Sequence, residues 1–118
     1  MAYNESNISV TLIAGADLRT HQFKFVSVDA NGAVVLTADD AKANGILLNA
    51  PNTGEAAEVS VPNGAISKVL CGAAVTRGGA VSSGANGAAK NADTGSVTLG
   101  TALETGASGR VISILFGN

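Results

Sequence analysis

The dipeptide Asn-Gly occurs four times in this chain, at residues 31–32, 44–45, 63–64 and 86–87. Asn and Gly both tolerate positive φ, which the two central residues of a tight hairpin turn require. Short segments that are separated by such turns are typical of an all-β fold.

Runs of β-type residues fill the segments between these turns. The predicted strands cover residues 8–12, 23–28, 33–37, 58–61, 65–70, 96–103 and 110–116. The runs that flank Asn31-Gly32 predict one hairpin, and the runs that flank Asn63-Gly64 predict another. The sequence therefore predicts an all-β protein, a compact small β-barrel or β-sandwich.

One short helix is expected near residues 38–44. Thr37 stands where a helix N-cap would stand, and Asp39 and Asp40 favour the positive end of a helix dipole. Gly45 follows as a left-handed stop. These signals predict about two helical turns.

Two segments, residues 1–7 and residues 78–96, lack this pattern of strands and turns. Residues 1–7 are polar and lack periodicity, which predicts a flexible N-terminal arm ahead of a single β domain over residues 8–118. Residues 78–96 are rich in Gly, Ser, Ala and Asn. They form either a loop or hairpin that orders on a partner, or a solvated loop.

The stretch 45–61 is echoed by the stretch 100–116, which lies 55 residues further on. Each opens on glycine, has leucine three places later and a second glycine nine places later, and ends in a run with apolar residues at alternate positions. The repeated order of strand, Gly-closed turn and strand predicts two similar hairpin units that pack together.

The two copies differ on one face of the last strand. In the first copy Glu58 and Ser60 lie between the apolar residues, so that face meets water. In the second copy Val111 and Leu115 lie there, and the strand is apolar on both faces. We expect Val111 and Leu115 to be covered by a second layer of the domain or by a neighbouring subunit, most readily in a homotrimer.

Composition and motifs argue against several functional classes. Charged residues make up 14% of the chain and the net charge is −2, which does not suit a nucleic-acid backbone. The sequence lacks a secretion signal and a run of membrane-helix length, which predicts a protein made in a cytoplasm, without a membrane partner. His21 and Cys71 are the only residues of their kinds, and no nucleophile elbow or phosphate-binding loop is present. We expect neither an enzyme, nor a cofactor, nor a metal site.

Small and apolar residues recur at a set of positions from the middle of the chain to its end. These positions are Gly45, Ile46, Leu47, Gly54 and Val59 in the middle, Gly64, Gly72, Ala73 and Val75 next, and Gly100, Thr101, Ala102, Leu103, Gly109, Val111 and Ile114 at the end. In this pattern, residues 12 to 117 resemble the capsid cement, or head decoration, proteins of tailed bacteriophages. Residues 22–31 depart from the pattern because they are more apolar and aromatic.

The resemblance implies a non-enzymatic virion protein that binds the outer surface of the mature capsid as an oligomer and stabilises it. Its partners would be the major capsid protein and other copies of this chain. Within the arm, Tyr3 is expected to anchor a capsid contact, with Asn4 and Ser6 beside it. The alternatives are another virion component, such as a tail or fibre subunit, and a non-catalytic β-sandwich module that binds a ligand.

Overall fold

The computed structural model describes residues 8–117, and these residues form two β-sheets. The strands are β1 (Ser9–Ala14), β2 (Phe25–Val28), β3 (Ala33–Leu36), β4 (Gly45–Leu47), β5 (Ala56–Ser60), β6 (Ile66–Leu70), β7 (Ala80–Ser83), β8 (Ala89–Asn91), β9 (Gly100–Ala102) and β10 (Val111–Phe116). Within the described range the helical structure is one 3-10 turn, η1 (Ala85–Gly87). The predicted all-β class is confirmed.

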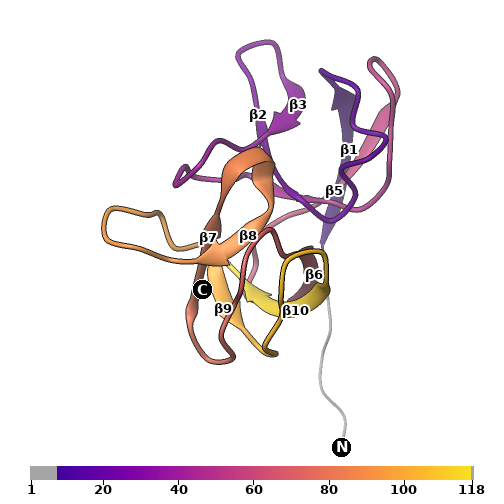
Figure 1. Ribbon diagram of the computed structural model, residues 1–118. Coiled ribbons are helices and arrows are strands. Elements are labelled where there is room, and N and C mark those ends of the chain that lie inside the picture. The colour runs from indigo at the N-terminus through magenta and orange to yellow at the C-terminus, as the bar shows by residue number, and fades with distance from the viewer. Residues whose placement is uncertain (1–7, 118) are drawn as a thin grey trace, which may run out of the picture.

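The chain divides into two halves that each build one sheet. Residues 8–61, the first half, form β1 to β5, and these strands join in the closed order β1-β3-β2-β4-β5. Residues 65–117, the second half, form a five-stranded sheet in the order β6-β10-β9-β7-β8. In Figure 1, β1, β2, β3 and β5 occupy the upper part of the molecule, and β6, β9 and β10 occupy the lower part.

The two halves have the same topology. The first sheet, read from β3, runs β3-β2-β4-β5-β1, and the second runs β8-β7-β9-β10-β6, so each strand matches the strand five places later. Hydrogen bonds between loops repeat as well. The amide of Gly54 donates to the carbonyl of Ala14, and the amide of Gly109 donates to that of Cys71. The echo in the sequence is thus part of a whole-chain duplication.

Glycines explain why the echo keeps its spacing. Gly54 and Gly109 have φ of 83° and 90° in the turns that close the β4–β5 and β9–β10 hairpins. A side chain at Gly100 would collide with the carbonyl oxygen of Leu115 on the paired strand. Both hairpins predicted from the echo are therefore confirmed.

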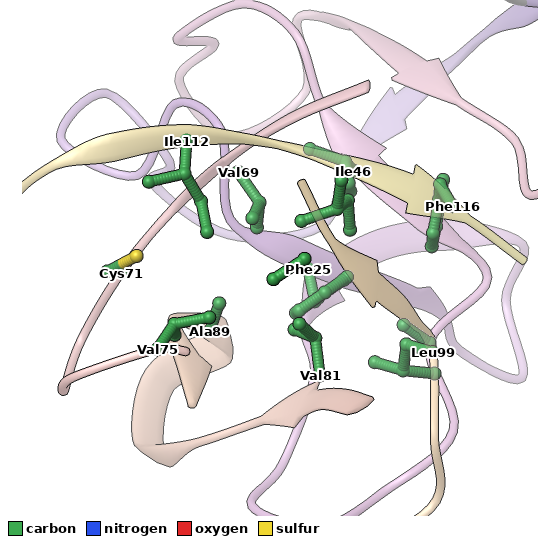
Figure 2. Close-up of a cluster of buried hydrophobic side chains, with 13 residues drawn as sticks. Phe25, Ile46, Val69, Cys71, Val75, Val81, Ala89, Leu99, Ile112 and Phe116 are labelled. Carbon is green, nitrogen blue, oxygen red and sulfur yellow. The ribbon is translucent and has the colours of Figure 1, made fainter. Parts of the chain in front are cut away.

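Two cores hold the fold together. The first lies inside the closed sheet, and its fully buried side chains include Val26, Val34 and Leu47. The second lies under β6 to β10, but Phe25 and Ile46 from the first half project into it (Figure 2). Because β2 and β4 bury both of their faces, the first half completes the core of the second in a sandwich-like packing.

The hairpin predicted around Asn31-Gly32 is confirmed, whereas the one around Asn63-Gly64 is wrong. Strands β2 and β3 are antiparallel neighbours across the first turn. Strand β5 instead pairs with β1 and β4, and β6 pairs with β10. Residues 62–64 therefore carry the chain from one sheet to the other, and Gly64 uses its φ of 81° for that crossing.

The helix expected near residues 38–44 is also wrong. Asp40 has φ of 61°, which interrupts any right-handed helix at its centre. The buried hydroxyl of Thr37 bonds to the hydroxyl of Ser27 at 2.8 Å instead of capping a helix. The carboxylates of Asp39 and Asp40 both bind Lys90 in the second half. Asp39 and Asp40, which resemble the acidic residues at the start of a helix, thus form ion pairs with a residue distant in sequence.

Candidate docking face

The outer side of β6 and β10 carries a group of apolar side chains that the rest of the described fold leaves partly open to solvent. Strand register places Val111 opposite Leu70 and Leu115 opposite Ile66. We call these four residues the docking face. On β10, Val111 and Leu115 alternate with Ile112 and Ile114, which are buried in the second core. Val111 is 41% exposed, and the other three are half-buried.

The matching positions of the first half provide an internal comparison, because both halves share one topology. There Ser9 stands in place of Ile66, Ile13 in place of Leu70, Ala56 in place of Val111 and Ser60 in place of Leu115. The Ser9 and Thr11 hydroxyls donate to the Glu58 carboxylate at 3.2 and 2.6 Å. Ile13 is 54% exposed and Ser60 is buried, so both halves expose an apolar side chain on this side, and the two halves differ most where Ser9 stands in place of Ile66.

The docking face carries little charge. Lys68 lies on β6 between Ile66 and Leu70 and is exposed. Opposite it, Ser113 donates its amide proton to the Glu104 carboxylate at 2.9 Å. A surface of this kind favours contact by shape and apolar burial over electrostatic attraction.

The structure brings Val111 and Leu115 together on one face, as the alternation predicts, and directs both away from the core. Whether a subunit covers them stays a prediction. The sequence analysis missed Ile66 and Leu70, although their spacing on either side of Lys68 carries the same signal. Tyr3, Asn4 and Ser6 lie outside the described residues.

A cluster of ionic side chains ties the two halves together elsewhere. The Lys90 ammonium lies 2.7 Å from Asp40, 3.0 Å from Asp39 and 3.5 Å from Asp93. The Lys90 ammonium and the Ser96 hydroxyl, which donates at 2.6 Å, hold the pKa of Asp40 below its usual range. The carboxylates of Asp40 and Asp39 raise the pKa of Lys90 in turn.

The backbone of Asp40 joins the same contact between halves. Its amide donates to the carbonyl of Ser83 at 2.9 Å, and its carbonyl accepts from the amide of Val97 at 3.2 Å. The positive φ of Asp40 aims both groups at the second half. This cluster therefore holds the β3–β4 connection in place against β7 and β8.

Two further titratable side chains have pKa values that burial shifts. The His21 Nδ1 lies 2.9 Å from the Lys24 ammonium, and partial burial and this charge lower the pKa of His21. Cys71 is buried, as expected for a small core residue, and burial raises the pKa of its thiol. Within residues 8–117, no group of three or more His, Cys, Asp or Glu is placed to hold a metal ion. Over the same range no helix is long and apolar enough to cross a membrane.

Comparison with known proteins identifies the fold. No protein-family model and no curated protein matches this sequence. Among solved structures, the crystal structure of the head fiber gp8.5 N base in bacteriophage phi29 superimposes with a TM-score of 0.78. The match covers 94% of this chain and 94% of that chain, at 17% sequence identity. This chain therefore shares the fold of a base segment of a phage head fibre.

Proposed function

We propose that this protein is a structural component of a bacteriophage virion, and that it binds the outer surface of the mature capsid and stabilises it. The observation that carries the proposal is the fold shared with a phage head fibre base over nearly the full length of both chains. Among residues 8–117 no group of His, Cys, Asp or Glu is placed to hold a metal ion, which is compatible with the proposal. The partners are the major capsid protein and other copies of this chain.

In this proposal the docking face forms the contact between subunits of a homo-oligomer, with a trimer favoured. Burying a Leu, Ile or Val side chain contributes about 1.5–3 kcal/mol. Four such side chains at one interface therefore supply a substantial part of the association energy of a small oligomer. An oligomer that bridges several capsid subunits multiplies a modest affinity at each contact.

The N-terminal arm supplies the contact with the shell, through Tyr3 as an apolar anchor and Asn4 and Ser6 as polar neighbours. Deleting residues 1–6 tests this part. The deletion should weaken binding to undecorated heads while residues 8–117 keep their β spectrum. An unchanged affinity would leave the arm without a role in shell binding.

A head fibre subunit is the second candidate, because the structural neighbour is the N base of a head fibre. A cement protein and a fibre base both attach to the head, but only a fibre base carries a further elongated part. Electron microscopy of purified particles separates them. A regular array of compact density over the head supports the cement role, and density that continues into projecting fibres supports the fibre role. Density confined to the tail would contradict both.

A further inference from the structure

Strand β1 has two edges, and the edge that faces away from β5 lacks a strand partner over its first part. The amide of Val61 donates to the carbonyl of Ile8, and the amide of Ala14 donates to the carbonyl of Glu55. Backbone groups alternate in direction along a strand, so the even-numbered residues of β1 bond to β5 and the odd-numbered ones point to the other edge. Strand β3 pairs with that edge only at Ile13 and Ala14. Among residues 8–117, the edge is therefore open before Ile13.

Ser9 and Thr11 carry the open backbone groups. Their amides and carbonyls point away from β5, and both residues are exposed. An unpaired strand edge is a template for a further strand, and proteins commonly block such an edge with Pro, Lys or a bulge. Residues 8–12 contain neither Pro nor a charged residue, and the register of β1 against β5 is continuous. The open edge is therefore suited to the addition of a strand.

Apolar side chains beside this edge are also uncovered. Val10 pairs with Val59, which is buried in the first core, so the Val10 side chain lies on the inner face of the sheet. Val10 is nevertheless 38% exposed, and Ile8 on the same face is 55% exposed. The counterpart of Val10 in the second half is Ser67, which is 2% exposed. The first half thus leaves apolar surface open at a place where the second half is closed.

We propose that β1 pairs with β1 of a second copy of this chain, in antiparallel register about a twofold axis at Val10. In this register Ser9 of each copy lies opposite Thr11 of the other. Because both residues direct their amide and carbonyl to the open edge, each such pair can exchange both of its backbone hydrogen bonds. Val10 then lies opposite Val10 of the second copy, and Ile8 lies opposite Leu12. Added strand and apolar contact together cover the open edge.

A second copy suits this edge because β1 is complementary to itself, as a twofold contact requires. Its inner face carries Ile8, Val10 and Leu12, which meet the same three residues of the second copy. Its outer face carries Ser9 and Thr11, whose hydroxyls already bind Glu58 of the same chain. The contact uses none of the four residues of the docking face. It therefore does not depend on the proposed function, and in a virion it would join one oligomer to the next.

Disulfide trapping tests the pairing and its register. Val10→Cys places two thiols opposite each other with their Cα atoms about 4.5 Å apart, within the range that a disulfide spans. Ile13→Cys is the matched control, because Ile13 is 54% exposed on the outer face of β1, beyond the open edge. The natural thiol of Cys71 is 1% exposed and does not compete.

Pairing raises the effective concentration of one thiol at the other, so Val10→Cys should cross-link between copies roughly tenfold faster than Ile13→Cys, or more. Chance collisions would favour the Ile13→Cys thiol, because that position is the more exposed of the two. Cross-linking of Val10→Cys that is no faster than that of Ile13→Cys would overturn the proposal. Circular dichroism of both variants confirms that folded proteins are compared.

Amide hydrogen exchange at the same protein concentration gives a second measurement. Val10→Lys places like charges opposite each other at the twofold axis, so exchange at the Ser9 and Thr11 amides should be several-fold faster than in the wild type. Ile13→Lys should leave both rates unchanged. The amide of Leu12 bonds to β5, so its protection in all three proteins shows that β1 stays in place.

Exchange at Ser9 and Thr11 that is as fast in the wild type as in Val10→Lys would overturn the proposal. Protection of these two amides without cross-linking at residue 10 would show that something other than a second β1 covers the edge, and would overturn it as well.

Discussion

Replacement of Phe25 by Ala tests whether the first half is needed to complete the core of the second. Phe25 is fully buried and lies in the same core as Phe116 (Figure 2). The centroids of the two rings are 5.9 Å apart, and the ring planes make an angle of 45°. Truncating a buried Phe to Ala costs about 3–5 kcal/mol. A domain of this length is stable by about 6–18 kcal/mol in total, so the loss is a large fraction.

Cys71 is the reporter for this experiment. It is the only cysteine, it is 1% exposed, and it belongs to the core cluster that Phe25 completes. A thiol reagent reaches it only when the second half opens, and the labelling rate then follows the population of the open form. A loss of 3–5 kcal/mol predicts labelling that is roughly 100- to 4,000-fold faster in Phe25→Ala.

Val26→Ala is the matched control, because Val26 is the next residue on β2 and faces the first core. Removing its two methyl groups costs about 1.6 kcal/mol, which corresponds to labelling about 15-fold faster if residues 8–118 unfold as the single domain that the sequence predicts. Labelling in Phe25→Ala within about threefold of wild type would refute the role assigned to Phe25.

Three further results are expected. Leu115→Asp places a charge on the docking face and should shift the protein toward monomer in analytical ultracentrifugation with its β spectrum intact; outright unfolding would instead place Leu115 in the monomer core. The contacts of Lys90 and Ser96 depress the folded-state pKa of Asp40, so the stability they contribute is present above the unfolded pKa near 4 and is lost as the pH falls through the folded value. Asp40→Asn should therefore flatten the acid side of the urea-midpoint profile, and an unchanged slope would contradict this. Gly100→Ala should lower the urea midpoint far more than Gly109→Ala, since only Gly100 faces a backbone collision, whereas Gly109→Ala should cost about 1–2 kcal/mol for its positive φ.

Local patterns predicted the elements that depend on local chemistry. The β-type runs at residues 23–28 and 33–37 on either side of Asn31-Gly32 sufficed for the β2–β3 hairpin, because a short turn leaves the strands little choice of partner. The echo at Gly45 and Gly100 identified two hairpins for the same reason. These glycines lie where the paired strand passes too close for a side chain.

Contacts between the two halves could not be predicted from local sequence patterns. Asn63-Gly64 has the chemistry of a hairpin turn, but β5 had already paired on both edges with β1 and β4, so β6 had to join the other sheet. Asp39 and Asp40 have the chemistry of a helix start, but Lys90 lies 50 residues away and takes both carboxylates. In both cases a partner distant in sequence decided the structure.

The sequence predicted two of the four residues of the docking face. The alternation along β10 identified Val111 and Leu115 as a second apolar face. Ile66 and Leu70 have a similar spacing on either side of Lys68, but their place beside Leu115 and Val111 follows from the register of β6 against β10, which the sequence pattern did not reveal. Comparison of the two halves then showed that Ser9 and Ser60 stand in the first half where Ile66 and Leu115 stand in the second.

The most direct test of the proposed function is to add the purified protein to phage heads that lack it, heat them, and follow DNA release. A protein that binds the intact shell and not its dissociated subunits stabilises each site by about 2.7 kcal/mol at 100 times its dissociation constant. The release temperature should therefore rise with added protein. The rise should persist in high salt, because the net charge of −2 offers little electrostatic attraction. A release temperature that does not move at saturating protein would contradict the capsid-stabilising function.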